Sequence, residues 1–146
     1  MPASTSRRPS GPAGRFIGVF LLLTAGNILA GSPLVSVSSS PFSITNENEE
    51  ATYTLTLSAP SSRNVGVAFV MTGTAIPGFD YILLGNFNKS GQIVIPAGQT
   101  SATVTLHTLP DDGFPAREIA TLNVLNAARY HIGSPSHADV IILPQR

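Results

Sequence analysis

Cysteine and tryptophan are both absent from this chain of 146 residues, and only 11% of the residues are charged. Without cysteine the chain has no disulfide framework, no thiolate zinc site and no cysteine nucleophile. Basic and acidic residues number eight each and no basic run occurs, which argues against nucleic acid as a partner. The hydrophobic share is nevertheless 42%, so the composition is that of a folded chain, and its length suits one domain.

The first thirty residues have the pattern of an export signal. Residues 1–15 are polar and include three arginines but no acid, and residues 16–30 are almost wholly apolar. A basic segment followed by a short apolar run is typical of a secretory signal peptide, and we expect cleavage near Ala30–Gly31. An uncleaved anchor is the alternative, but a spanning helix needs about 20 apolar residues and this run is shorter. The sequence therefore predicts a signal at 1–30, a folded domain at 31–146, secretion to the cell exterior or surface, and no stable membrane span after cleavage.

The rest of the chain predicts β-strands. In Ala51–Leu57, apolar residues alternate with threonines, which is the period of a strand with one face in water. The same period recurs further along, and turn-forming clusters rich in Pro, Gly, Asp and Ser separate the segments. Residues 79–84 read as a connection. Strands are expected at 34–38, 51–57, 65–71, 91–95, 101–107, 117–125 and 138–143. Seven short strands indicate an all-β, antiparallel, immunoglobulin-like sandwich.

The last expected strand differs from the others because it is apolar on both faces. It contains Val140, Ile141, Ile142 and Leu143. Two interpretations fit: a central strand beneath a long loop, or an edge strand intended for another chain. The second makes these four residues candidates for an interaction site.

The order of several segments is more specific than a generic sandwich. EATYTLTLSAP at 50–60, GTAIPGFDY at 73–81, the PAGQTS segment at 96–101, LPDD at 109–112 and EIATLNVLN at 118–126 follow one another. This series resembles the Calx-beta domain over residues 34–143. The resemblance implies a seven-stranded immunoglobulin-like sandwich of the kind found in sodium/calcium exchangers and extracellular adhesion or matrix proteins. In members that bind calcium, acidic residues in loops at one end of the sandwich hold the ions.

Four acidic residues match the ligand positions of that family. Asp80 precedes the family's tyrosine, Asp111 and Asp112 match its paired aspartates, and Glu118 matches a following glutamate. At other ligand positions this chain departs from the pattern, with Asn46, Thr72, Pro115 and Pro144 in place of acids.

Two interpretations of these acids stay open. Calcium requires 6–8 oxygen ligands, so the four acids would support one weak site and not a cluster of ions. Alternatively, Asp111 and Asp112 form a turn without any ion, and Asp80 accepts hydrogen bonds within its own loop. The sequence thus establishes no cofactor, and calcium is the one candidate ligand.

The sequence gives little support for a histidine metal site or for catalysis. His107, His131 and His137 are the only imidazoles; the last two flank a turn and would approach each other if it closes a hairpin. Two histidines without a nearby carboxylate pair make a poor zinc site. No serine lies in a Gly-x-Ser-x-Gly turn, and no nucleophile, base and acid converge, so we do not expect an enzyme. Asn88 begins a glycosylation triplet in a predicted surface loop.

Two functions are consistent with these observations. The first is an extracellular structural or adhesive module that contacts a protein partner or copies of itself through exposed β-edges, in a surface layer, matrix or filament. The alternative is a calcium-binding regulatory sandwich with a weak site in the loops at one end.

Overall fold

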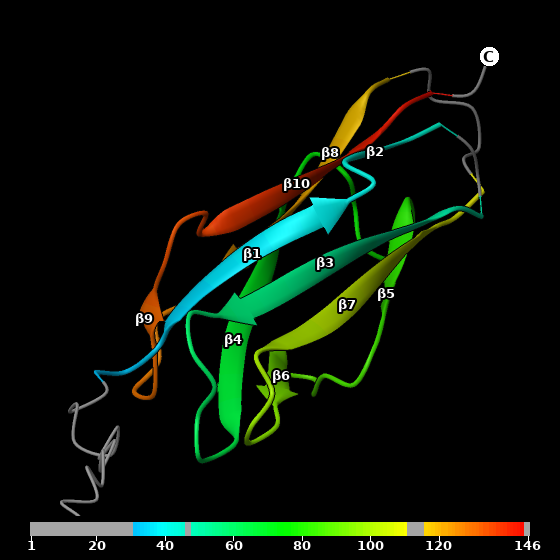
Figure 1. Cartoon of the computed structure of the whole chain (residues 1–146). Coiled ribbons are helices and arrows are strands. Elements are labelled where there is room, and N and C mark those ends of the chain that lie inside the picture. The colour runs from blue at the N-terminus through cyan, green and yellow to red at the C-terminus, as the bar shows by residue number, and fades with distance from the viewer. Residues whose placement is uncertain (1–30, 46–47, 111–115, 145–146) are drawn as a thin grey trace, which may run out of the picture. The chain divides into compact units, whose positions relative to one another are not determined.

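The computed structural model describes residues 31–45, 48–110 and 116–144, which form two packed β-sheets (Figure 1). One sheet has the strand order β5-β7-β3-β1-β9 and the other β2-β10-β8-β4-β6. The strands are β1 (Leu34–Ser40), β2 (Ser43–Ile44), β3 (Glu50–Leu57), β4 (Val65–Gly73), β5 (Tyr81–Leu84), β6 (Gln92–Ile95), β7 (Ser101–Thr108), β8 (Glu118–Val124), β9 (His131–Ile132) and β10 (His137–Ile142).

The predicted fold class is confirmed, and each of the seven expected strands is present. Three further strands were not expected. β5 lies where a connection was predicted, and β2 and β9 are two-residue strands that each pair in parallel with a longer neighbour. The sandwich is therefore antiparallel except at these two short ladders. β2 and β9 are too short to show any alternation, and the four residues of β5 follow other apolar residues in what resembles a loop, so none of the three stands out in the sequence.

The core is built from the apolar alternation of the long strands. In β3 the buried side chains are Ala51, Tyr53, Leu55 and Leu57, and the threonines between them face outward. β3 pairs with β1 on one side and β7 on the other, so its inner face is covered by the second sheet. The alternation thus places one face of each sheet in a shared core.

Three buried tyrosines have different polar surroundings. Tyr53 Oη donates to the carbonyl of Ala120 at 2.7 Å and so joins β3 in one sheet to β8 in the other. Tyr130 Oη donates to the carbonyl of Leu125 and accepts from the amide of Ala68 at 3.1 Å. Tyr81 Oη has no hydrogen-bond partner among the described residues. Burial raises the pKa of all three phenols, that of Tyr81 to about 12.

Serine and threonine side chains cover most of the outer face of the first sheet. Neighbouring rows on β1, β3 and β7 place a serine or threonine opposite another in register, for example Ser38 opposite Thr54 and Thr54 opposite Thr103. These side chains satisfy the outward positions of the strands without charge. They account for the low charge of the sequence.

Candidate binding surfaces

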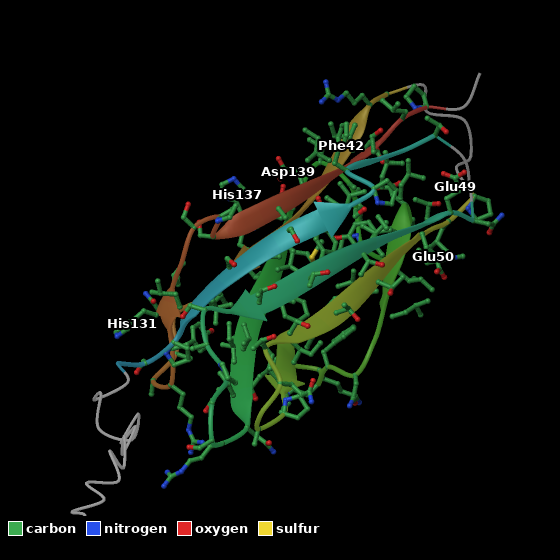
Figure 2. The ribbon with its side chains drawn as sticks, viewed as in Figure 1. Phe42, Glu49, Glu50, His131, His137 and Asp139 are labelled. Atoms are coloured by element: carbon green, nitrogen blue, oxygen red, sulfur yellow. The ribbon has the colours of Figure 1, made fainter. Side chains whose placement is uncertain are left out.

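Described acids gather at one end of the sandwich, which we call the acidic end and define by Glu49, Glu50, Asp80 and Glu118. Glu50 begins β3 opposite His107 of β7, and the carbonyl of Asp80 accepts from the amide of Leu109 just beyond β7. Glu118 begins β8 opposite Ile142. Figure 2 shows Glu49 and Glu50 together where β3 begins. The loops of both sheets therefore bring these carboxylates to the same end.

The sequence-predicted calcium ligands are only partly placed there. Asp80 Oδ2 accepts a hydrogen bond from the amide of Ile76 at 2.5 Å, which is the loop-capping role that the sequence also allowed. Thr72, at a ligand position of the family, accepts instead from Asn123 Nδ2 at 2.8 Å. Asp111 and Asp112 lie outside the described residues. Within the described part of the chain, no three His, Asp or Glu side chains form a group that could hold a metal ion. These residues alone do not fit a calcium site.

The apolar strand Val140–Leu143 falls between two other strands rather than at an edge. β10 pairs with β8 on one side and with β2 on the other. The amides of Ile141 and Leu143 donate to the carbonyls of Phe42 and Ile44, at 2.8 and 2.9 Å. Of the two interpretations of this segment, a central strand or an edge strand for another chain, the structure matches the first. The backbone of this segment is bonded within the chain itself.

Two outer strands, β5 and β6, are each bonded at their first residue to the turn before them. On β5, the carbonyl of Tyr81 accepts from the amide of Gly78 at 2.8 Å, so the preceding turn is bonded to the first residue of the strand. On β6, the carbonyl of Gln92 accepts from Asn88 N and its amide donates to Asn88 Oδ1. Such bonds hinder edge-to-edge pairing with other chains at these residues. Contacts with a partner are therefore better sought on faces and ends of the sandwich than on strand edges.

The three histidines do not form a joint site. His131 on β9 pairs with Leu34 of β1, whereas His137 on β10 pairs with Asn123 of β8, so the two do not face each other across a hairpin (Figure 2). Asp139, near His137, accepts from Thr121 Oγ1 at 2.6 Å. His107 lies with its Nδ1 3.5 Å from Glu50 Oε1. That nitrogen is buried and has no hydrogen-bond partner among the described residues.

Large apolar side chains are exposed at the acidic end. Phe79 is 75% exposed and Phe42 is 69% exposed, and Ile76 lies in the same loop as Phe79. The carbonyl of Phe42 accepts from the amide of Ile141, which pairs with Ile119. The carbonyl of Ile119 in turn accepts from the amide of Ala75, next to Ile76. The loop of Phe42 and the loop of Phe79 therefore meet the same end of the second sheet. Phenylalanine side chains this exposed have no role in the core.

A groove on the second sheet was not expected from the sequence. It has a volume of about 360 Å³. Its lining residues come from β4, β6 and the turns beside them: Asn64, Gly66, Gln92, Val94, Ala127, Ala128 and Arg129. The side chain of Gln92 lies over Gly66, since a Cβ at Gly66 would be 2.8 Å from Gln92 Nε2. These residues are far apart in the sequence. The pairing of β4 with β6, and the hydrogen bonds of Leu125 and Tyr130 to Ala68 of β4, bring them together.

No protein-family model and no curated protein matches the sequence. Among solved structures, the chain is similar to the apo form of the Calx CBD1 domain, with a TM-score of 0.58 and 20% identity over 77% of this chain and 99% of that one. It is also similar to CBD12 from CALX1.2 and to the calcium binding domain CBD12 of CALX1.1. Both have a TM-score of 0.56 and 20% identity, over 73% and 74% of this chain. This chain spans 44% of the length of each of those two. The likeness extends over most of the described strands, and it shows that the chain has the two-sheet sandwich fold of Calx-beta domains.

Proposed function

We propose that this protein is an exported structural or adhesive module that acts by contact and not by catalysis. In this proposal residues 1–30 direct export and are removed, and residues 31–146 form the working domain. The observation on which it rests is the exposure of Phe42 and Phe79 at the acidic end. Exposed aromatic side chains next to polar groups are typical of protein interfaces, where aromatic residues supply much of the binding energy.

The described surface supports contact without chemistry. The outer face of the first sheet carries mostly hydroxyls, and the three histidines lie on separate strands, with His107 beside Glu50. Within the described ranges, no helix is long and apolar enough to span a membrane. Because β10 is bonded to β2, and β5 and β6 are each bonded to the turn before them, we assign the contact to the ends and faces of the sandwich.

Cross-linking on intact cells tests this proposal. We expect a photoreactive side chain at position 79 to give a discrete cross-linked product on the outside of the producing cells. Phe79→Ala should weaken the contact about fivefold or more, since loss of an aromatic residue that anchors an interface costs over about 1 kcal/mol. The same probe at Lys89, which lies in the loop before β6, is the control and should give no product. Retention of the chain inside the cell, or equal cross-linking from both positions, would contradict the proposal.

Calcium binding is the second candidate function. A similar solved structure is described as a calcium binding domain, and four described acids lie at one end of this sandwich. Such a site would also need Asp111 and Asp112, because the described acids do not suffice. We expect millimolar calcium to raise the melting temperature of the chain, because a ligand that binds only the folded state stabilises it. Asp111→Asn with Asp112→Asn should remove that rise. An unchanged melting temperature in the parent chain would exclude this function.

A further inference from the structure

The charges of the described residues are separated along the strands. The acidic end holds four carboxylates, with Arg117 as the basic residue described beside them. At the opposite end, where β4 begins and the groove lies, Arg63 and Arg129 are found, and the described segments 57–65, 95–101 and 124–131 contain no acid. The ends are opposite because Val65 begins β4 next to Ile95, whereas Gly73 ends β4 next to Ala120, two residues from Glu118.

The polar groups of the groove are mainly hydrogen-bond donors. The guanidinium of Arg129 contacts the carbonyl of Asn64 at 3.5 Å, and no described carboxylate lies within ion-pair distance of it. Asn64 Oδ1 already accepts from the amide of Ala97 at 2.9 Å, which leaves its NH₂ group free to donate. The amide of Gln92, which also lines the groove, lies over Gly66. A guanidinium and two amides facing one space favour a carboxylate as the ligand.

The walls of the groove suit an apolar group beside that carboxylate. Val94 is 45% exposed, and Ala127 and Ala128 offer only methyl groups. Gly66 has no side chain, which leaves room for the side chain of Gln92 above it. A ligand that presents a carboxylate next to a bulky apolar side chain would match both the donors and the walls.

We infer that the groove binds the acidic end of a second copy of this chain, so that copies associate head to tail. The acidic end carries carboxylates, which complement the hydrogen-bond donors of the groove. It also carries the exposed side chains of Phe42 and Phe79, which complement the apolar walls. The inference deepens the proposed function, on which it rests, by naming the partner. Because the two surfaces differ, the contact is heterologous, and repeated addition gives an open chain of copies unless the rotation closes a ring.

Sedimentation of the purified chain over a range of concentrations tests this contact. We expect association that weakens when salt rises from about 0.02 to about 0.5 M, because the attraction between the ends is screened. Arg129→Glu should weaken association at least tenfold. Gln92→Glu adds a carboxylate of nearly the same shape inside the groove and should also weaken association. Gln99→Glu makes the same change in a turn at that end but outside the groove, and it is the matched control.

Mixing two defective variants separates a head-to-tail contact from a symmetric one. Arg129→Glu damages the groove but keeps the acidic end, and the double variant Glu50→Lys, Phe79→Ala does the reverse. Each alone should be monomeric, and the mixture should form dimers that do not grow further. Far-ultraviolet circular dichroism and the melting temperature show whether each variant is folded.

The outcomes distinguish this inference from the broader proposal. A parent chain that stays monomeric at low salt, or Arg129→Glu that associates as the parent does, overturns the head-to-tail contact. If position 79 nevertheless cross-links to another protein on the cell surface, the proposed function stands and the partner is foreign. Dimers formed by Arg129→Glu alone would indicate a symmetric contact and would likewise overturn the inference.

Discussion

Gly73→Ala is expected to destabilise the protein by about 3 kcal/mol or more, measured as the free energy of unfolding in urea. Gly73 ends β4 with φ at 115°, a backbone conformation that residues with a side chain rarely adopt. A Cβ built there would lie 2.0 Å from the carbonyl oxygen of Ile119. That oxygen already accepts the amide of Ala75 at 3.0 Å, so moving it aside would also disturb this hydrogen bond. The substitution thus combines backbone strain with a clash against backbone that cannot rotate away.

Gly98→Ala is the matched control, because it isolates the strain from the clash. Gly98 also has a positive φ, at 80°, but a Cβ there would meet no atom within 4 Å. We expect a loss of about 1 kcal/mol from the conformation alone. Equal losses in the two variants would show that the loop around Ile119 relaxes and that the close approach at Gly73 has no energetic consequence.

Most of the fold could be predicted from the sequence because long strands repeat one physical pattern many times. In Ala51–Leu57 each inward position is apolar and each outward position between them is a threonine, so one misread residue would not change the prediction. Tyr81–Leu84 has only four residues, with Ile82 partly exposed, and its pattern does not differ from that of a loop with apolar residues. Its identity as a strand comes from pairing with β7, which is a property of the tertiary structure.

The candidate surfaces were harder to predict because they depend on pairing between distant segments. Alternation identified Val140–Leu143 as unusual, but only the fold shows that β2 bonds to its backbone. The groove joins Gly66, Gln92 and Arg129, which share no motif. The one indication of the groove in the sequence was Arg129, which lies in a long segment without acids. The acidic end was anticipated through Asp80 and Glu118, whereas the exposed Phe42 and Phe79 were not singled out.

Alkaline pH is expected to unfold the protein through its tyrosines. An unfolded tyrosine ionises near pH 10, whereas burial raises the pKa of Tyr53, Tyr81 and Tyr130 in the folded protein, that of Tyr81 to about 12. Between these values the unfolded chain loses protons that the folded chain keeps. The stabilisation is therefore complete below pH 10 and is lost as the pH rises from about 10 toward about 12. The loss is at most about 1.4 kcal/mol per pH unit for each tyrosine.

Phenolate absorbance measured together with circular dichroism checks this prediction, because these three are the only tyrosines in the chain. Phenolate should appear in the same pH range in which the β-sheet signal disappears. Tyr81→Phe removes one titrating group, so stability should fall less steeply above pH 10. At neutral pH this variant should keep its stability, because Tyr81 Oη has no described hydrogen-bond partner. Tyr53→Phe should instead cost about 1–3 kcal/mol, because it leaves the buried carbonyl of Ala120 without this donor. If phenolate forms near pH 10 while the sheet signal persists, the phenols ionise within the folded protein, and their burial does not make folding depend on pH.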